Sequence, residues 1–396
     1  MTNGQSTTAT DKKRRRRIFR LLLLLFTLVM LLPDSYIFAR HHQQWPLWAQ
    51  IAWWLPTAIT VAILYNGQHW KRTWRFTTVM VTTMCCTLPK IVYTLCALAG
   101  QGIACWWPPA NDIGHLTGLA AAAATLITMA YGFIFGWKRI AVRHVDIFFP
   151  HLPEDFDGYR LVQLSDLHIS TMGKDRALLK KIIDQVNTLH ADAIAFTGDL
   201  INMTYEEVTP VQDQLSRLRA RDGVFSVFGN HDYAPFDRFL RPGHPADTPL
   251  IEKERAMGWH LLLNEHCLIS RGASKIAFVG VENIGRRPFP KMGRLDDALK
   301  GLPHDVFAIL LSHDPSHWRM EVLPSTNIPL TLSGHTHAGQ MKIGGWSPVK
   351  WIYREWSGLY EEGGQYLYVS EGTGARVPFR VGTKAEITLI CLHRKA

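Results

Sequence analysis

The sequence predicts a membrane region of several helices followed by an α/β domain, and the distribution of apolar and charged residues carries this prediction. Residues 1–145 contain four long apolar stretches, whereas short aliphatic runs alternate with amphipathic segments from Asp146 onward. Charge divides at the same point: residues 1–145 hold 15 Lys and Arg against 3 Asp and Glu, and residues 146–396 hold 28 against 30. The second part has no excess of basic charge, so we expect no nucleic-acid partner.

The four apolar stretches are each long enough to cross a bilayer as a helix, which takes about 17–25 residues. Nine of the 14 tryptophans fall within residues 1–145, most of them near the ends of the stretches, as in an interfacial aromatic belt. Four buried helices of a soluble domain are the alternative, but few charges interrupt the stretches. We therefore expect the lipid bilayer as a partner and four transmembrane helices, at Ile18–Ala39, Leu47–Tyr65, Trp74–Ala99 and Ile113–Gly136.

The basic residues of the loops predict the orientation of these helices. They are concentrated before the first stretch, between the second and the third, and after the fourth, whereas the other two loops hold only Arg40. By the positive-inside rule, both ends of the region then face the cytoplasm. The expected domains are a basic cytoplasmic N-terminus at residues 1–17, four transmembrane helices at 18–145 and a cytoplasmic domain at 146–396.

Two other interpretations of the N-terminus stay open. A basic run followed by Leu21–Leu25 resembles the start of a cleaved signal peptide, although no A-x-A-like site follows it. The run Arg16-Arg17-Ile18-Phe19 resembles a twin-arginine export signal, which would reverse the topology. The three further apolar stretches favour an uncleaved anchor.

Lys90, which follows Pro89, lies inside the third apolar stretch. A charge at this depth indicates a functional site. The alternatives are that the side chain extends to the membrane interface, or that the helix breaks at Pro89.

The second part of the chain reads as an α/β domain because short buried runs alternate with helical segments that have one apolar face. The segment Tyr233–Gly258 is rich in proline and glycine and is expected to be an insertion near the active face. Strands are expected at Tyr159–Leu164, Ala193–Thr197, Val224–Phe228, Lys275–Val281, Val306–Leu311, Leu330–Ser333, Gln365–Val369 and Glu386–Leu392, and helices at Lys174–His190 and Val208–Ala220.

Polar side chains follow five of these strands at the point where each strand ends, which is the usual place of an α/β active site. Their oxygen and nitrogen donors, without thiolates, suit Mn, Fe, Zn or a similar divalent ion. Seven ligands exceed the needs of one tetrahedral ion and suffice for two ions sharing a carboxylate, an arrangement that promotes displacement at phosphorus. The candidate ligands are Asp166, His168, Asp199, Asn230, His313, His335 and His337.

The order of the motifs D-x-H, G-D, G-N-H-D, H and G-H-x-H resembles the calcineurin-like metallophosphoesterase superfamily, over about residues 155–393. This resemblance implies a sandwich of two mixed β-sheets flanked by helices, and a centre of two divalent metal ions. It also implies that His231 stabilises the phosphate or protonates the leaving group, and that Asp232 orients His231. The implied ligands are Asp166, His168 and His337 for one ion and Asn230, His313 and His335 for the other, with Asp199 bridging both.

The segment Tyr366–Arg380 and the final EITLI strand are similar to bacterial membrane-anchored phosphoesterases, whose relatives include UDP-2,3-diacylglucosamine hydrolases. This likeness implies a multi-pass enzyme of the bacterial inner membrane that hydrolyses a phosphomonoester, phosphodiester or pyrophosphate bond of a lipid-linked or nucleotide-linked substrate. Arg376 and Arg380 either meet a substrate phosphate or lie at the surface. His317 is an alternative ligand to His313, but the position of His313 at a strand end favours His313.

Two other functions stay open. One is a non-enzymatic membrane sensor or transporter subunit with a phosphoesterase-like domain, which the complete set of ligands disfavours. The other is an exported, wall-associated phosphatase, which requires the twin-arginine interpretation of the N-terminus.

Overall fold

The structure is a computed structural model that describes residues 9–66, 73–172, 176–233, 249–285 and 291–395. The chain forms two compact units, Met1–Tyr131 and Gly132–Ala396. We call them the membrane unit and the α/β unit. The basic loop residues Lys71 and Arg72, and most of the expected insertion Tyr233–Gly258, lie outside the described residues.

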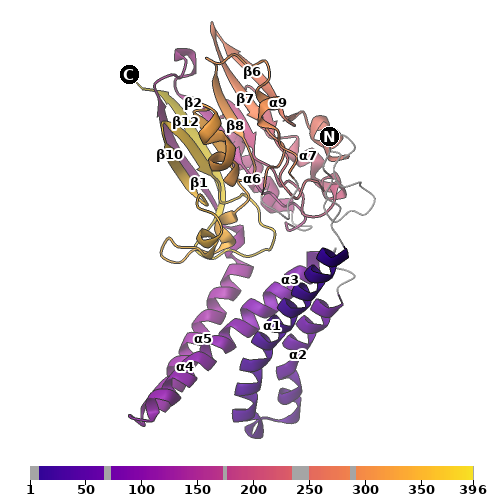
Figure 1. Ribbon diagram of the computed structural model, residues 1–396, viewed down its shortest axis with the longest axis vertical. Coiled ribbons are helices and arrows are strands. Elements are labelled where there is room, and N and C mark those ends of the chain that lie inside the picture. The colour runs from indigo at the N-terminus through magenta and orange to yellow at the C-terminus, as the bar shows by residue number, and fades with distance from the viewer. Residues whose placement is uncertain (1–8, 67–72, 173–175, 234–248, 286–290, 396) are drawn as a thin grey trace. The chain divides into compact units, whose positions relative to one another are not determined.

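The α/β unit contains two six-stranded sheets (Figure 1). The first has the strand order β1-β12-β2-β3-β4-β5 and the second the order β10-β11-β9-β8-β7-β6. Each sheet is mixed, because β12 runs antiparallel to β2 in the first, and β11 and β7 pair antiparallel with β10 and β6 in the second. The predicted sandwich of two mixed sheets is thus confirmed. The strands are β1 (Ile140–Phe149), β2 (Tyr159–Leu164), β3 (Ala193–Phe196), β4 (Val224–Ser226), β5 (His260–Leu261), β6 (Glu265–Arg271), β7 (Ser274–Gly280), β8 (Phe307–Leu311), β9 (Leu330–Ser333), β10 (Gly358–Glu362), β11 (Gln365–Val369) and β12 (Ala385–Arg394).

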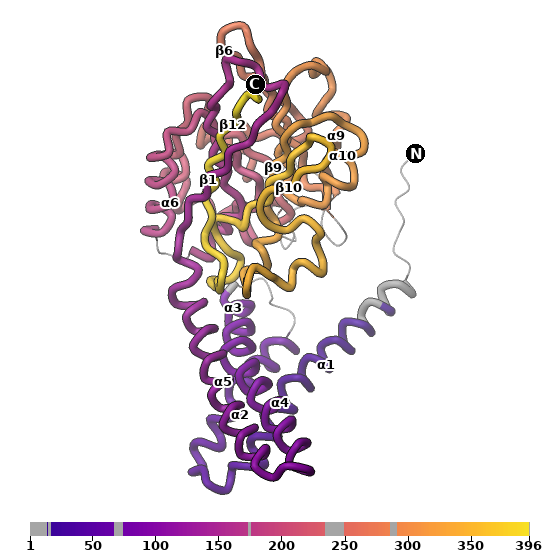
Figure 2. The backbone as a smooth tube through the Cα atoms, turned by 90° about the vertical axis from the view of Figure 1, so that its left-hand side faces the viewer, coloured from indigo at the N-terminus to yellow at the C-terminus, as the bar shows by residue number. Residues whose placement is uncertain are grey.

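Apolar side chains fill the space between the sheets and cover their outer faces. Phe225 of β4 stacks on Phe278 of β7, with ring centroids 4.1 Å apart. On the outer face of the first sheet, α6 (Arg176–Thr188) buries the apolar stripe that its sequence predicts. On the outer face of the second sheet, α9 (Leu295–Leu299) and Trp318 form a separate cluster. Figure 2 shows α6 and α9 on opposite sides of the strands. The unit is therefore layered as α6, first sheet, second sheet and α9.

β1 places the start of the α/β unit earlier than the sequence suggests. It pairs in parallel with β12 from Ile140 opposite Ala385 to Phe149 opposite Arg394. The expected boundary between residues 145 and 146 therefore falls inside this strand. Arg143 contributes to a basic cluster that looks like the flank of a transmembrane helix, but its backbone is paired with the far end of the chain.

The predicted helix Val208–Ala220 is wrong over most of its length. The chain there forms short 3-10 turns and the one-turn helix α7 (Gln212–Leu215). Just before this segment, Glu207 accepts hydrogen bonds from three successive backbone N–H groups, Asn202 to Thr204. The edge strands β6 and β10 are absent from the prediction because their side chains are mostly half-exposed and form no continuous apolar run. The remaining short helices are α8 (Pro249–Ala256) and α10 (Leu323–Ser325).

The membrane unit is helical, as predicted. Four helical segments are long and apolar enough to cross a membrane: Arg17–Gln44, Leu47–Tyr65, Trp74–Ala104 and Ala110–Lys138. A π-helical turn at Thr83–Thr87 joins two helices into the third segment. The helices are α1 (Ala9–His41), α2 (Leu47–Tyr65), α3 (Thr73–Thr82), α4 (Leu88–Ala104) and α5 (Ala110–Ile134), which continues into the α/β unit.

Lys90 is paired inside the membrane unit. Its Nζ lies 2.6 Å from Oδ1 of Asp34 in α1, whose side chain is 1% exposed. Thr57 of α2 donates a hydrogen bond to the other carboxylate oxygen of Asp34. The ammonium group also lies 3.8 Å from the ring centroid of Trp53, whose indole N–H donates to the Asp34 carbonyl. Lys90 thus does not extend to the interface. Pro89 is the second residue of α4 and follows the π-helical turn directly, so the segment stays helical there but changes its hydrogen-bond pattern.

This group of four side chains ties three helices together around one charge pair. A buried charge is tolerated only when it is paired and hydrogen-bonded. Asp34, which the sequence analysis did not single out, supplies the partner. Its position could have been suspected, since it is the one acidic residue within the first apolar stretch.

Lys90→Met should lower the melting temperature of the detergent-purified protein markedly, because Asp34 keeps a buried charge without its cation. Breaking a buried pair costs about 3–5 kcal/mol. The double variant Asp34→Leu/Lys90→Met removes both charges and should be more stable than Lys90→Met alone. Thermal unfolding followed by tryptophan fluorescence measures both changes.

Lys180→Met is the matched control, because the Lys180 Nζ also lies 2.6 Å from a carboxylate, that of Asp184, but both side chains are about 60% exposed. Exposed pairs of this kind contribute only about 0.3–0.5 kcal/mol. A Lys90→Met protein as stable as the Lys180→Met protein would show that the Asp34 pair does not hold the helices.

Candidate metal centre

Five loops bring polar side chains to one edge of the two sheets. In the first sheet, β2, β3 and β4 are parallel neighbours that end shortly before Asp166, Asp199 and Asn230. In the second sheet, β8 and β9 are parallel neighbours that end shortly before His313 and His335. The predicted ligands are all buried apart from His335, which is partly buried.

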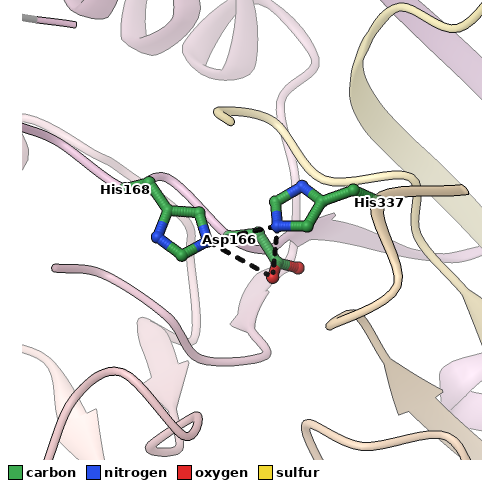
Figure 3. Close-up of side chains that lie close together, drawn as sticks. All are labelled: Asp166, His168 and His337. Atoms are coloured by element: carbon green, nitrogen blue, oxygen red, sulfur yellow. Dashed lines mark hydrogen bonds and ion pairs between the residues drawn. The ribbon is translucent and has the colours of Figure 1, made fainter. Parts of the chain in front are cut away.

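The first cluster consists of Asp166, His168 and His337, whose ligand atoms all lie within 4.8 Å of one another (Figure 3). The two Nε2 atoms of His168 and His337 are 3.1 Å apart, and Nε2 of His337 is 3.2 Å from Oδ1 of Asp166. Ser165 and the backbone N–H of His335 donate to Oδ2 of Asp166. This leaves Oδ1 of Asp166 directed at the two imidazoles.

The second cluster consists of Asp199, His313 and His335. Nε2 of His313 lies 3.2 Å from Oδ2 of Asp199 and 3.2 Å from Nδ1 of His335. Nδ1 of His313 donates to the Thr197 carbonyl at 2.7 Å. Nε2 of His335 lies 2.7 Å from the hydroxyl of Tyr353. Because a partner holds the other ring nitrogen in each case, one nitrogen of each imidazole is directed into the cluster.

Asp199 lies between the two clusters. Its Oδ2 is 3.2 Å from Nε2 of His313 and 3.6 Å from Nε2 of His168. Its Oδ1 accepts a hydrogen bond from the backbone N–H of His231 at 2.8 Å. The same Oδ1 lies against Gly229, where any Cβ would be 2.2 Å away. The motif glycine is therefore required for the close approach of this carboxylate.

Several buried polar atoms of the predicted ligand residues have no hydrogen-bond partner. These are Oδ1 of Asp166, Oδ1 of Asn230, and the Nδ1 atoms of His168 and His337. An unpaired buried polar atom is costly, and native proteins keep few of them. The two carbonyl-type oxygens face positions where a cation would satisfy them. The donor set therefore fits two divalent ions.

Backbone strain is concentrated at the same residues. Positive φ angles, which residues other than glycine rarely adopt, occur at Asp166 (55°), His168 (44°), Asp199 (58°), His335 (71°) and His337 (50°). Such conformations cost about 1–3 kcal/mol each and are found mainly at functional sites. The fold maintains them because they aim the side chains at one another.

Charges within the site prepare it for cations. Burial lowers the pKa of His168, His335 and His337, so these imidazoles are neutral near pH 7. Burial also disfavours the charged form of His313, but the adjacent Asp199 carboxylate raises the pKa of His313 to about 10. Before any ion binds, His313 thus carries a proton that a metal must displace, since imidazole binds metals in its neutral form.

Comparison with known proteins identifies the family. Residues 159–339 match the family of calcineurin-like phosphoesterases, and residues 16–137 match a family described as a probable calcineurin-like phosphoesterase transmembrane domain. An uncharacterized metallophosphoesterase of Bacillus subtilis (strain 168), YkuE, is 31% identical over 291 residues, which are 69% of this chain and 93% of that protein. The chain belongs to the calcineurin-like metallophosphoesterases.

A vertebrate protein is also similar to this chain. A transmembrane protein with metallophosphoesterase domain from Danio rerio is 30% identical over 285 residues, which are 69% of this chain and 62% of that protein. The chain thus spans a little less than two thirds of the zebrafish protein. The structure of phosphopantetheinyl hydrolase (PptH) from Mycobacterium tuberculosis has 13% identity and a TM-score of 0.34, covering 56% of this chain and 91% of that one, which is too distant to inform the site.

As a calcineurin-like metallophosphoesterase, the protein is a metal-dependent phosphoester hydrolase of a family that uses a dinuclear divalent metal centre. The two groups of Asp and His side chains described above agree with such a centre. The four candidate transmembrane segments likewise agree with the transmembrane family matched by residues 16–137.

His231 and Asp232 have partners that the sequence did not predict. Nδ1 of His231 lies 2.7 Å from the carbonyl of Asn202, which therefore orients the ring. The Asp232 carboxylate instead accepts the backbone N–H groups of Gly229, Asp199, Leu200 and Ile201. The expectation that Asp232 orients His231 thus differs from the structure. Asp232 is adjacent in sequence, but its carboxylate is used to fasten the loop after β3 to the loop after β4.

Burial and contacts bear on the alternatives for three other residues. His317 is buried outside both clusters, with its Nδ1 2.9 Å from the Ser312 hydroxyl, so His313 is the residue that joins the second cluster. Arg380 is buried, and its guanidinium donates to the carbonyls of Glu371, Gly372 and Gly374, so a surface position does not describe it. Arg376 is partly buried near Asp199.

Tyr353 is a site residue that the sequence analysis missed. It lies in an irregular segment, and no strand pattern precedes it. Only the fold brings its hydroxyl to Nε2 of His335. A tyrosine shortly after the G-H-x-H motif is too weak a signal to have identified it.

His317 generates a pH-dependent stability prediction. Burial lowers its pKa to about 4, well below the value of about 6.5 in an unfolded chain. The unfolded state therefore binds a proton more readily, so stability is lost as the pH falls from about 6.5 to about 4. His317→Gln should remove about 3 kcal/mol of this loss. We expect its melting temperature to fall less steeply over this range than that of the wild type.

His304→Gln is the control, because His304 is an exposed histidine of the same unit. Its pH profile should match the wild type, including any loss caused by titration of the metal ligands. Parallel profiles for wild type and His317→Gln would contradict the buried neutral state of His317.

Proposed function

We propose that the two clusters hold two divalent metal ions that together activate hydrolysis of a phosphate ester at the membrane. The position of Asp199 supports this most directly, because one carboxylate oxygen faces an imidazole of each cluster. Two such ions would neutralise charge on the phosphate and lower the pKa of water, so that hydroxide is available as the nucleophile near neutral pH. The donor atoms suit Mn, Fe or Zn.

In this assignment, Asp199 bridges the two ions. Asn230 joins the second group because its buried Oδ1 has no hydrogen-bond partner. The hydrogen bond that His313 donates to the Thr197 carbonyl and the hydrogen bond between His335 and the Tyr353 hydroxyl keep both imidazoles aimed inward. The ligands of the first ion are Asp166, His168 and His337, and those of the second are Asn230, His313 and His335.

His231 is proposed to donate a proton to the leaving oxygen. Its ring lies perpendicular to that of His168, with centroids 5.0 Å apart, which places it beside the first cluster. Because Nδ1 donates to the Asn202 carbonyl, Nε2 is the nitrogen left to face the substrate. General acid catalysis of this kind contributes about 10²–10⁴-fold. Arg376, near Asp199, is proposed to bind a phosphate oxygen.

The substrate is proposed to be lipid-linked or nucleotide-linked, with the α/β unit in the cytoplasm of a bacterial cell. The alternation of basic and non-basic loops supports this orientation. A reporter fused to the C-terminus should be active only in the cytoplasm. Activity outside it would support the exported phosphatase.

The test of the proposed function is hydrolysis by the full chain in detergent with Mn²⁺, Fe²⁺ or Zn²⁺. Substrates should include an aryl monoester, an aryl diester, a nucleotide-sugar pyrophosphate and a phospholipid. A chelator-treated sample is the control. Equal turnover with and without chelator, or none on any substrate, would contradict the proposal.

Asp199→Asn should reduce metal content at both sites together, because the amide supplies one oxygen where the carboxylate supplies a charged bridge. His168→Ala should reduce mainly one site. Metal analysis of the purified variants measures both. Two ions per chain at full occupancy in Asp199→Asn would disprove the bridging role.

His231→Asn should retain both ions and the melting temperature while turnover falls about 10²–10⁴-fold. The loss should be larger for a substrate with an alkyl alcohol leaving group than for an aryl one, which needs little protonation. Steady-state rates on the two substrates decide this. Equal losses on both would exclude an acid role, and loss of melting temperature alone would indicate packing.

A further inference from the structure

The chain enters the α/β unit at the edge that carries the metal centre. β12 runs antiparallel to β2, and β1 runs parallel to β12, so the first residue of β1 lies at the same edge as the last residues of β2. The backbone N–H of Ala385, at the start of β12, donates to the carbonyl of Arg139. Asp166 follows two residues after the end of β2. The fourth candidate span ends at Lys138, two residues before β1 begins at this edge of the first sheet.

Two loops of the α/β unit gather at this edge, one after β9 and one after β11, as the gold and yellow segments show in both views (Figures 1 and 2). Phe379 packs on Phe133, with ring centroids 4.8 Å apart, and the backbone N–H of Arg380 donates to the carbonyl of Gly132. Lys342 and Val381 join the two loops through a backbone hydrogen bond. The loop after β9 is thus anchored, through the loop after β11, to residues at the end of the fourth span.

The loop after β9 exposes a compact group of large apolar side chains, which we call the Trp351 patch. Its members are Ile343, Trp346, Trp351 and Ile352, which are 65%, 38%, 78% and 64% exposed. The two indole rings touch edge to face, 5.0 Å apart. Four such side chains within ten residues are unusual on a water-facing surface, where exposed apolar residues are normally scattered.

The exposed charged side chains within residues 341–357 are basic, although Arg354 lies 3.5 Å from the buried Glu355 carboxylate and close to Glu362. Lys350 and Arg354 are exposed beside it. Of residues 341–357, all of which the structure describes, none exposes a carboxylate, because Glu355 is buried and paired with Arg319. Tryptophan with isoleucine and flanking basic residues is typical of segments that lie in the membrane interface next to anionic headgroups.

The patch is fastened to the metal centre. Tyr353, directly after Ile352, contacts the predicted ligand His335. Thr336 donates to the carbonyl of Trp356, and Ser347 donates to the carbonyl of Ala338. A surface that binds the patch therefore lies close to the loop that carries His335.

We propose that the Trp351 patch inserts into the bilayer interface and that the substrate is a phosphate ester of a lipid in that bilayer. This inference rests on the proposed function, which supplies the hydrolytic step. The indole and isoleucine side chains occupy the interface, and Lys350 and Arg354 lie among anionic headgroups. A lipid phosphate then reaches the metal centre without leaving the bilayer, whereas a protein partner or a second copy of the chain would cover the patch instead.

The location of the patch is tested with the full chain in nanodiscs of phosphatidylcholine and phosphatidylglycerol. Protein labelled with 5-fluorotryptophan gives a ¹⁹F resonance for Trp351, assigned by its loss in Trp351→Phe. Lipids with a nitroxide on the acyl chain should broaden this resonance. They should leave the resonance of Trp318 sharp, since that side chain is 1% exposed in the α/β core. A Trp351 resonance as sharp as that of Trp318 overturns the proposal, whether a partner, a second copy or water covers the patch.

The substrate class is tested with matched lipids. Phosphatidic acid and phosphatidylglycerol with long chains reside in the nanodisc, and their dibutyryl counterparts are soluble with the same headgroups. Trp346→Ser/Trp351→Ser should lower the ratio of long-chain to dibutyryl turnover at least tenfold. Met320→Ser/Leu359→Ser is the control, because these side chains are 50% and 41% exposed elsewhere on the unit and the ratio should not change.

The outcomes separate the two proposals. Turnover of dibutyryl lipids with none of long-chain lipids overturns the lipid substrate while leaving the phosphoesterase function intact. An unchanged ratio in the Trp346/Trp351 double variant overturns the role of the patch. No metal-dependent turnover on any ester contradicts the proposed function, and the ¹⁹F measurement then decides the membrane contact by itself.

Discussion

The carboxylate of Asp199 lies between imidazoles of both clusters, inside a region from which water is largely excluded. A charge in that position requires compensation on every side. The backbone N–H of His231 donates to one of its oxygens, and His313 faces the other. Burial alone would raise the pKa of Asp199. The neighbouring histidines, above all His313, instead hold this pKa well below its usual range. Two sheets must converge for these groups to meet, so the sandwich and the site depend on each other.

Asp232 has a supporting task in the same arrangement. Its carboxylate gathers four backbone N–H groups from the two loops that carry Asp199 and Asn230. Burial and the charge of Asp199 raise the pKa of Asp232 to about 7. The four hydrogen bonds to Asp232 hold the two loops at the short separation that the strained backbone of Asp199 requires.

Buried charges hold the C-terminal segment beside the first cluster. Glu371 accepts hydrogen bonds from Arg143 of β1, from Lys342 and from Ser357. Arg380 binds three carbonyls of the adjacent turn, and burial lowers its pKa to about 10. These contacts hold Gly372 next to the first cluster. A Cβ at this position would lie 2.8 Å from Nδ1 of His337. The same network joins the strand that follows the last transmembrane helix to the loop that bears the Trp351 patch.

The sequence by itself determined the features that depend on local pattern. The length of the apolar stretches predicts four spans, and the period of the apolar residues predicts α6 and most central strands. The candidate ligands could be named because each follows an apolar strand, and strand ends converge whenever parallel strands are neighbours. The assignment of each ligand to an ion stays a prediction.

Only the tertiary structure decided which distant groups become partners. Lys90 pairs with Asp34, and Tyr353 contacts His335. The Asp232 carboxylate accepts backbone N–H groups, and His231 donates to the Asn202 carbonyl. The tertiary structure also recruits Arg143 and the rest of β1 into a sheet with β12, more than 200 residues away in the chain. Periodicity encodes how deeply a residue is buried, but a buried polar group is satisfied by whichever partner the packing of remote segments places beside it, and no local pattern contains that information.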